Sequence, residues 1–121
     1  IVLAVPATPQ TRGMIGASEI ARMPAGAVLI NVARGSVIDE HALIDALHAG
    51  RLRGAGLDVF ATEPLPAGSP LWTLPNVLVT PHVSATSTRF WEREGGLILE
   101  NLQRYLSGRD LVNVVDTAAG Y

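Results

Sequence analysis

The sequence contains neither cysteine nor lysine among its 121 residues. Without cysteine, a disulfide scaffold, a thiolate zinc site and a cysteine nucleophile are all excluded. Without lysine, any mechanism that uses a catalytic lysine is excluded, and the nine basic residues are arginines scattered along the chain. The lack of cysteine does not identify a compartment, because secreted proteins can also lack it.

The sequence also has little excess charge and no long apolar run. Its formal net charge of −2 argues against a nucleic-acid-binding surface, which needs a concentrated positive field. No signal-peptide pattern opens the sequence, and no apolar run approaches the roughly 18 residues of a membrane span. We therefore expect a cytoplasmic protein without nucleic-acid or membrane partners.

What the sequence does contain is enough apolar material for a compact core. Hydrophobic residues make up 48% of the chain and charged residues 17%, and the length is that of one ordinary domain. The chain opens at Ile1 with the apolar run IVLAV, which has the character of a buried strand. A sequence that begins inside a core strand favours a fragment of a longer protein.

Four apolar segments of strand length alternate with helical patterns. The predicted strands are residues 1–5, 27–32, 54–60 and 76–80. The predicted helices are residues 18–23 with Ser18 as the cap, 39–49 with Asp39 as the cap and Gly50 after the end, and about 87–106.

This alternation predicts an α/β fold. Short strands joined through helices or long loops require crossover connections, and these produce a parallel sheet. We expect part of a Rossmann-type, doubly wound sheet, in which ligands bind at the carboxyl ends of the strands. Chemistry should therefore lie just after the second, third and fourth strands.

Polar side chains occupy those positions. Arg34 follows the second strand, Asp58 and Glu63 lie at and after the end of the third, and His82 follows the fourth. A guanidinium binds a carboxylate in a bidentate, planar way, and an imidazole can give or take a proton at neutral pH. Together with a carboxylate that orients the ring, they suit a 2-oxo acid whose carbonyl is protonated by His82. The hydride must then come from a nicotinamide cofactor, because no side chain here can donate one.

Each of these residues also has a simpler interpretation. Arg34 alone would be a loop arginine paired with a nearby acid. His82 alone would fill the turn before the long helix, and Glu63 alone would be an exposed loop carboxylate. Their joint placement at successive strand ends favours the site.

Other candidates are weaker. His41 and His48 share one predicted helix but have no third ligand, so we expect no metal site. The pair Gly54 and Gly56 begins a strand, unlike a dinucleotide fingerprint, and is expected to permit close packing. Gly95-Gly96 inside the long helix predicts the close approach of another segment. Trp72 and Trp91 could line a pocket, but packing in a core or an interface is the favoured expectation.

Several ordered motifs resemble the D-isomer-specific 2-hydroxyacid dehydrogenases, glyoxylate/hydroxypyruvate reductases included. They are VPATPQTRGMIG at residues 5–16, LINVARGSVIDEHALIDAL at 29–47, GAGLDVFATEP at 54–64, PNVLVTPHVSA at 75–85 and LVNVVDTAAGY at 111–121. The resemblance covers essentially the whole chain.

The resemblance implies a role for each matching residue. Arg34 matches the substrate-binding arginine, Glu63 the acid paired with the catalytic histidine, and His82 the general acid/base. The resemblance also implies cofactor-binding residues: Val5, Pro6, Val32, Ala33, Arg34, Asp58, His82, Ser84 and Ala85. Asp58 matches the residue at the nicotinamide end.

The sequence departs from the family pattern in one part. The glycine-rich turn that holds the cofactor pyrophosphate does not occur in it, nor does the residue that selects NAD or NADP. We expect residues 1–86 to form the C-terminal part of the cofactor-binding domain. Residues 87–121 would form a helix and tail that return to a substrate domain outside this sequence.

The resemblance implies an NAD(P)-dependent enzyme, by analogy a homodimer, that interconverts a small 2-oxo acid and a D-2-hydroxy acid. Two alternatives remain open. One is a truncated domain, so that residues 1–121 alone are inactive. The other is a nucleotide-sensing relative, similar to a corepressor, on the same fold.

Overall fold

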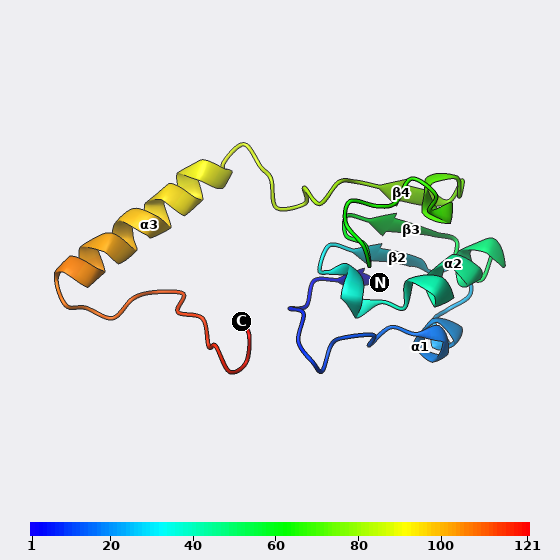
Figure 1. The fold of residues 1–121 in the computed structure, drawn as a ribbon, viewed down its shortest axis with the longest axis horizontal. Coiled ribbons are helices and arrows are strands. Elements are labelled where there is room, and N and C mark those ends of the chain that lie inside the picture. Colours follow the sequence, from blue (N-terminus) through cyan, green and yellow to red (C-terminus); the bar gives the residue numbers. More distant parts are fainter. The chain divides into compact units, whose positions relative to one another are not determined.

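The computed structural model describes residues 1–121, which divide into two compact units, Ile1–Ser84 and Ala85–Tyr121. The first unit contains one parallel sheet in the order β1-β2-β3-β4 (Figure 1). Its strands are β1 (Val2–Leu3), β2 (Val28–Asn31), β3 (Gly54–Leu57) and β4 (Val77–Val79). This confirms the predicted α/β class and the parallel sheet.

Two helices of this unit lie side by side, α1 (Ala17–Arg22) and α2 (Glu40–His48). Asp39 caps α2 as predicted, because its side chain accepts hydrogen bonds from the backbone N–H groups of His41 and Ala42. The prediction of Ser18 as the cap of α1 is wrong. Gly16 is the cap residue, and its N–H donates to Glu19 Oε2 at 3.0 Å. The side chain three residues on therefore sets the start of this helix.

The strands are shorter than predicted, at both ends for the first, second and fourth and at the carboxyl end for the third, which begins at Gly54 as predicted. The third ends at Leu57 and not at Phe60, although Asp58 N still donates to Asn31 O at 3.0 Å. The chain then leaves the sheet, because Phe60 N donates to the Glu63 side chain and not to a neighbouring strand. Only two residues of the predicted first strand pair with β2.

The core of the first unit lies between the sheet and the two helices. Leu29, Leu43, Leu52, Leu71 and Val37 are its largest fully buried apolar side chains. The opposite face carries one residue from each strand in register, namely Val2, Ile30, Gly56 and Leu78. Of these, Val2, Ile30 and Leu78 are exposed, because side chains alternate between the two faces of a strand.

Close packing at the start of β3 confirms the expectation for Gly54. A Cβ at this residue would lie 2.7 Å from Asn76 O, which is closer than real Cβ contacts. Gly56 is less demanding, because its Cβ would lie 3.7 Å from the Ile30 side chain. The close approach of β3 to the chain entering β4 therefore requires a glycine at residue 54 and not at residue 56.

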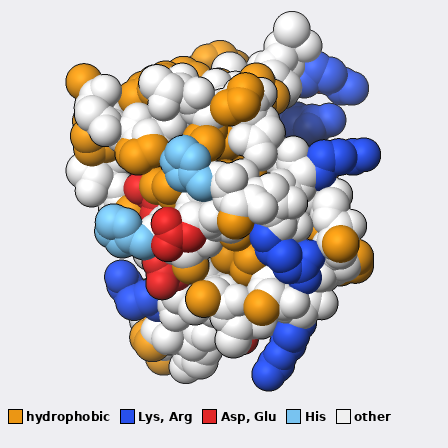
Figure 2. All heavy atoms as spheres, turned by 90° about the vertical axis from the view of Figure 1, so that its right-hand side faces the viewer, with side chains coloured by type: hydrophobic (Ala, Val, Ile, Leu, Met, Phe, Trp, Pro, Cys, Tyr) orange, Lys and Arg blue, Asp and Glu red, His pale blue; other side chains and the backbone are white.

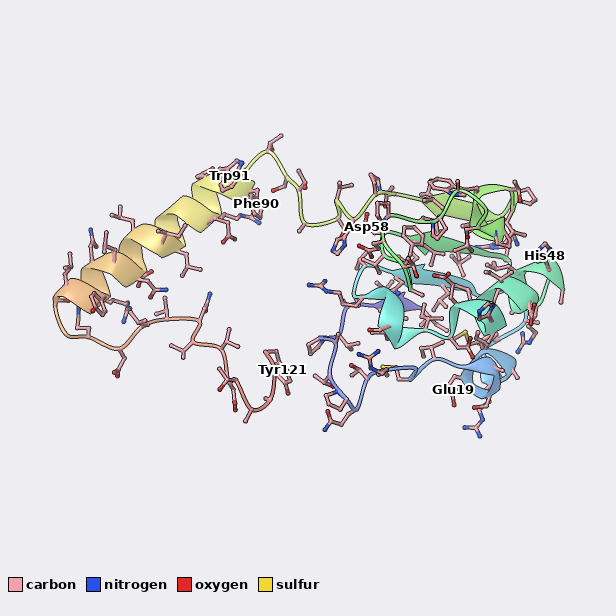
Figure 3. The ribbon with its side chains drawn as sticks, in the orientation of Figure 1. Glu19, His48, Asp58, Phe90, Trp91 and Tyr121 are labelled. Atoms are coloured by element: carbon pink, nitrogen blue, oxygen red, sulfur yellow. The ribbon has the colours of Figure 1, made fainter.

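The second unit contains helix α3 (Phe90–Leu106), which begins three residues later than predicted. Residues 87–89 form a turn instead, closed by a hydrogen bond from Phe90 N to Ser87 O. The Phe90 and Trp91 rings meet edge to face at 5.0 Å in its first turn (Figure 3). Trp91 is exposed and so does not pack in a core.

The glycine pair of α3 has no near neighbour within this chain. A Cβ at Gly95 or Gly96 would meet nothing within 4 Å, so the expected close approach is not seen. The helix is amphipathic, and its apolar side chains Ile98, Leu102 and Tyr105 are exposed. None of the helices combines the length and apolar character needed to cross a bilayer.

Candidate active site

The predicted polar residues follow consecutive strands at one edge of the sheet. Arg34 comes after β2, Asp58 and Glu63 after β3, and His82 after β4. Because the strands are parallel, their carboxyl ends share this edge, and Figure 3 shows Asp58 there. Several contacts connect these three loops.

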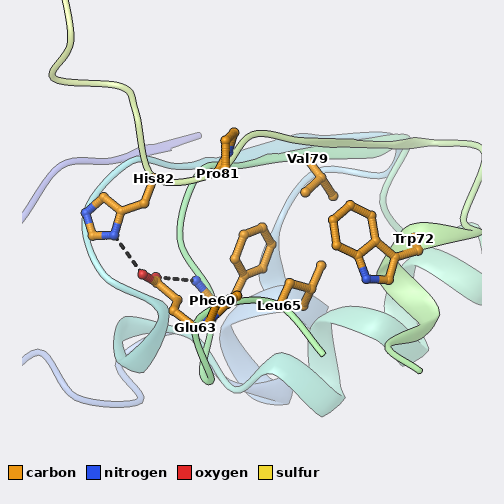
Figure 4. Close-up of a pocket in the computed structure, with 8 residues that line it drawn as sticks. Phe60, Glu63, Leu65, Trp72, Val79, Pro81 and His82 are labelled. Atoms are coloured by element: carbon orange, nitrogen blue, oxygen red, sulfur yellow. Dashed lines mark hydrogen bonds and ion pairs between the residues drawn. The ribbon is translucent and has the colours of Figure 1, made fainter. Parts of the chain in front are cut away.

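Glu63 and His82 form a close pair. His82 Nδ1 lies 2.7 Å from Glu63 Oε2, and Phe60 N donates to Glu63 Oε1 at 3.0 Å (Figure 4). The hydrogen bond with His82 lowers the pKa of Glu63, as do the Phe60 N–H and the positive charges of His82 and Arg34, against the opposing effect of burial. An ionised Glu63 accepts a hydrogen bond from Nδ1–H, so Nε2 is the nitrogen left for proton transfer.

His82 has an unusual backbone conformation. Its φ of 55° lies in the left-handed region, which costs a residue with a Cβ of the order of 1–3 kcal/mol. Such a conformation persists only where the surrounding structure holds it. At the same time the ring is partly exposed, with a side-chain exposure of 44% against 34% for Glu63, so a substrate can reach it.

Asp58 holds the loop that carries His82. Oδ1 accepts hydrogen bonds from Thr80 Oγ1 at 2.5 Å and from Val83 N at 2.9 Å, and Oδ2 accepts one from Ser84 N at 2.8 Å. The residue is 3% exposed. Burial alone would raise the pKa of Asp58, but these hydrogen bonds outweigh it and keep the pKa far below its usual range.

Asn31, which the sequence analysis did not select, organises the Arg34 loop. It is 1% exposed, its Oδ1 accepts a hydrogen bond from Ala33 N at 3.0 Å, and its Nδ2 donates to Arg34 O at 3.0 Å. A polar residue at the end of a buried strand, in the inward register of its apolar neighbours, is the signal that would have identified it.

Arg34 is exposed and makes no ion pair with any carboxylate. Its Nη1 donates to its neighbour's carbonyl, Ala33 O, at 2.7 Å. The simpler interpretation of a loop arginine bound to a nearby acid is therefore wrong. A guanidinium without an acidic partner, whose charge acts on Glu63, can bind an anionic substrate group.

Gly35 brings the arginine loop against the glutamate loop. A Cβ built on it would overlap the carbonyl of Phe60 and press on Ala61 N. Ala61 N is also held from the helix side, where it donates to Glu40 Oε2 at 2.9 Å. The backbone next to Arg34 thus touches the backbone that leads to Glu63.

Replacement of Gly35 by Ala is expected to destabilise the fold by about 1–3 kcal/mol, because the new methyl group must displace backbone and not a flexible side chain. Urea unfolding measures this loss. Gly68→Ala is the matched control, since a Cβ there meets nothing within 4 Å and the residue needs no positive φ. Equal stability of the two variants would show that the loops do not touch.

The predicted cofactor residues differ in exposure. At the end of β2, Val32 is 37% exposed whereas Ala33 is buried. Val5 is half-buried, and Pro6 and Ser84 are exposed. An exposed apolar side chain beside an unpaired arginine fits a flat aromatic ring linked to an anionic group, which is the chemistry of a nicotinamide dinucleotide. Ala85 is exposed in the second unit, and its role stays a prediction.

An apolar pocket of about 580 Å³ adjoins the Glu63–His82 pair. Its wall consists of Phe60, Glu63, Pro64, Leu65, Trp72, Val79, Pro81 and His82. Figure 4 shows Phe60, Leu65 and Trp72 on the Glu63 side of the imidazole, with Nε2 directed away from them. The pocket therefore lies on the Nδ1 side of the His82 ring, opposite Nε2, the nitrogen that can transfer a proton. Trp72 is exposed and lines this pocket, so it does not pack in a core.

Elsewhere on the molecule charges are dispersed. Figure 2 shows arginine side chains projecting from several separate places on one face, with acidic side chains and histidines also present. No group of three or more His, Asp or Glu side chains is arranged to hold a metal ion. The groups brought together at the sheet edge are thus an arginine, two carboxylates and one histidine.

Much of the chain matches a known protein family. Residues 1–84 match the NAD-binding domain of the D-isomer specific 2-hydroxyacid dehydrogenases. A D-3-phosphoglycerate dehydrogenase of Methanocaldococcus jannaschii is 45% identical over 96% of this chain, which spans 22% of that protein.

Two solved structures share the fold. A D-isomer specific 2-hydroxyacid dehydrogenase from Xanthobacter autotrophicus, in complex with NADPH, superposes with a TM-score of 0.91 at 48% identity, over 99% of this chain and 49% of that one. An NADPH-dependent glyoxylate/hydroxypyruvate reductase from Sinorhizobium meliloti gives 0.90 at 42% identity, over 99% and 39%. The predicted family and cofactor class, NAD or NADP, are confirmed. The chain belongs to the D-isomer specific 2-hydroxyacid dehydrogenase family.

Proposed function

We propose that this chain carries the catalytic residues of an oxidoreductase that interconverts a small 2-oxo acid and a D-2-hydroxy acid. The observation that carries the proposal is the Glu63–His82 pair, 2.7 Å apart, on loops next to an arginine that has no acidic partner. An anion-binding group and a proton-transfer group at the same sheet edge suit a substrate with both a carboxylate and a carbonyl.

In this proposal Arg34 binds the substrate carboxylate and His82 serves the carbonyl oxygen. In the reductive direction, protonated His82 gives its Nε2 proton to the oxygen, while Glu63 accepts a hydrogen bond from Nδ1–H and so stabilises the charged ring. In the oxidative direction, neutral His82 accepts the hydroxyl proton at Nε2. NAD(P)H, when bound, supplies the hydride that reaches the carbonyl carbon.

The remaining site residues are proposed to contact the cofactor. Val32 and Ala33 would lie beside it at the end of β2, and Val5 and Pro6 would line the adenosine side. Asp58, Ser84 and Ala85 would lie toward the nicotinamide, with Arg34 and His82 adjoining the reacting end. The exposed apolar side chain of Val32 supports this arrangement, because a flat ring can pack against it.

Glyoxylate and hydroxypyruvate are the substrates to test first, because one similar solved structure is a glyoxylate/hydroxypyruvate reductase. A homodimer in the cytoplasm is part of the same proposal. We expect the complete polypeptide that carries these residues to oxidise NADH or NADPH with one of these oxo acids, followed at 340 nm. Absence of turnover with a panel of small 2-oxo acids, despite measurable cofactor binding, would instead favour a nucleotide-sensing protein.

Residues 1–121 alone are expected to show no turnover in the same assay, because they contain no glycine-rich turn to hold the pyrophosphate. Clear NAD(P)H oxidation by that mass-verified polypeptide would overturn this part of the proposal.

A further inference from the structure

The loop that carries His82 is fixed on both sides of the histidine by a single carboxylate. Before it, Thr80 Oγ1 donates to Asp58 Oδ1. After it, the backbone N–H groups of Val83 and Ser84 donate to Oδ1 and Oδ2. The three residues and Asp58 are called the Asp58 clamp below.

We propose that Asp58 is a positioning residue, which holds His82 in the backbone conformation that its proton transfer requires. The proposal rests on the proposed function for its catalytic consequence, and on the contacts above for its structural part. The resemblance predicts that Asp58 contacts the cofactor. The positioning role proposed here is additional, because it concerns the hydrogen bonds from Asp58 to the loop of His82.

The backbone of His82 is held in an unfavourable conformation. Its φ of 55° is unfavourable for a residue with a Cβ, and an unrestrained loop would relax toward negative φ. His82 N donates only to Thr80 O, two residues earlier, at 3.1 Å. Thr80 N donates to Leu57 O and the His82 ring contacts Glu63, and the other long-range hydrogen bonds that hold this loop come from Asp58.

The backbone conformation of His82 sets the direction of its imidazole ring. With φ at this value, Nδ1 lies 2.7 Å from Glu63 Oε2, and the ring presents Nε2 on the opposite side. Rotation of the backbone at residue 82 would move the Cβ and with it the ring, which would lengthen this contact. A loop that loses the clamp is thus expected to lose the alignment of Nε2 before it loses any cofactor contact.

Asp58 is buried among hydrogen-bond donors. The residue is 3% exposed and its donors are the hydroxyl and backbone groups of one loop. A buried carboxylate with several directional donors keeps its position, because any displacement leaves a desolvated charge without partners. Asp58 can therefore act as a rigid anchor for the histidine loop.

The test compares Asp58→Asn with the pair Thr80→Val and Thr80→Ser in the complete polypeptide. In Asp58→Asn the amide NH₂ would face Ser84 N–H, so one side of the clamp opens. We expect kcat to fall on the order of 10²-fold, with the oxo-acid KM changed by less than about twofold. Thr80→Val should lower kcat on the order of 10-fold, and Thr80→Ser, which keeps the hydroxyl, should restore it.

Hydrogen–deuterium exchange supplies a readout that does not depend on activity. Peptides covering residues 80–84 should exchange faster in Asp58→Asn and Thr80→Val, whereas peptides covering β2 should not change. A rise in cofactor Kd equal to the fall in kcat, with unchanged exchange in the loop, would overturn the proposal. If Asp58→Asn fails to fold, the two Thr80 variants decide, and equal kcat for them would overturn it.

The two proposals can fail separately. If the wild-type polypeptide has no turnover with 2-oxo acids, the proposed function fails, while the exchange measurements still support or overturn the clamp.

Discussion

Replacement of His82 by Asn is expected to lower kcat by about 10²- to 10⁴-fold, the range that general acid–base catalysis contributes. Asn has no titratable nitrogen to replace Nε2 of the imidazole in proton transfer. It is also one of the residues that best tolerates a left-handed backbone, so the φ of 55° can be kept. The oxo-acid KM and the NAD(P)H Kd should change little. Steady-state kinetics and a fluorescence titration of NAD(P)H measure the two effects separately.

His48→Asn is the control for this substitution. His48 is exposed in the last turn of α2, and it should tolerate the same chemical change without loss of activity. If His82→Asn lowered cofactor affinity as much as kcat, His82 would have a structural role and proton transfer would have to be assigned to another group.

Replacement of Arg34 by Gln is expected to raise the oxo-acid KM by at least about 10²-fold. Each hydrogen bond to a charged group contributes about 1.5–3 kcal/mol, and a guanidinium can form two of them with one carboxylate. Arg34→Lys should give an intermediate KM, because it keeps the charge and loses the planar pair of donors. Initial-rate kinetics at saturating NAD(P)H, together with the cofactor Kd, measure the change.

Arg53→Gln removes an exposed arginine away from the candidate site and is the matched control for charge. An unchanged KM in Arg34→Gln, or an equal rise in Arg53→Gln, would mean that Arg34 does not bind the substrate carboxylate and that only the net charge matters.

The order of elements was readable from the sequence because apolar runs and capping residues are local signals. Asp39 caps its helix as predicted, and the four parallel strands appear in the predicted places. The ends of the strands were not readable. The third predicted strand stops at Leu57, because the Glu63 side chain accepts the hydrogen bond from Phe60 N–H. The spacing of apolar residues in the sequence does not reveal that contact.

The candidate site shows the same limit. Arg34, Glu63 and His82 could be selected by residue type and by position after a strand, and the contact between Glu63 and His82 is present. Asn31 was missed although its place at the end of an apolar strand is a local signal. The Asp58 clamp and the approach of Gly35 to Phe60 could not be selected, because each joins residues that are far apart in the sequence and depends on the folded backbone.

The contact of Gly35 with Phe60 has a consequence for the shape of substrate that this site can accept. Backbone of the arginine loop touches backbone of the glutamate loop, and Glu63 in turn holds His82. Under the proposed roles, main-chain contact then sets the spacing between the loop that carries the carboxylate-binding group and the loop that carries the acid paired with the proton-transfer group. Variation among relatives should accordingly change which substituent a substrate carries, while the carbonyl stays next to the carboxylate in every substrate.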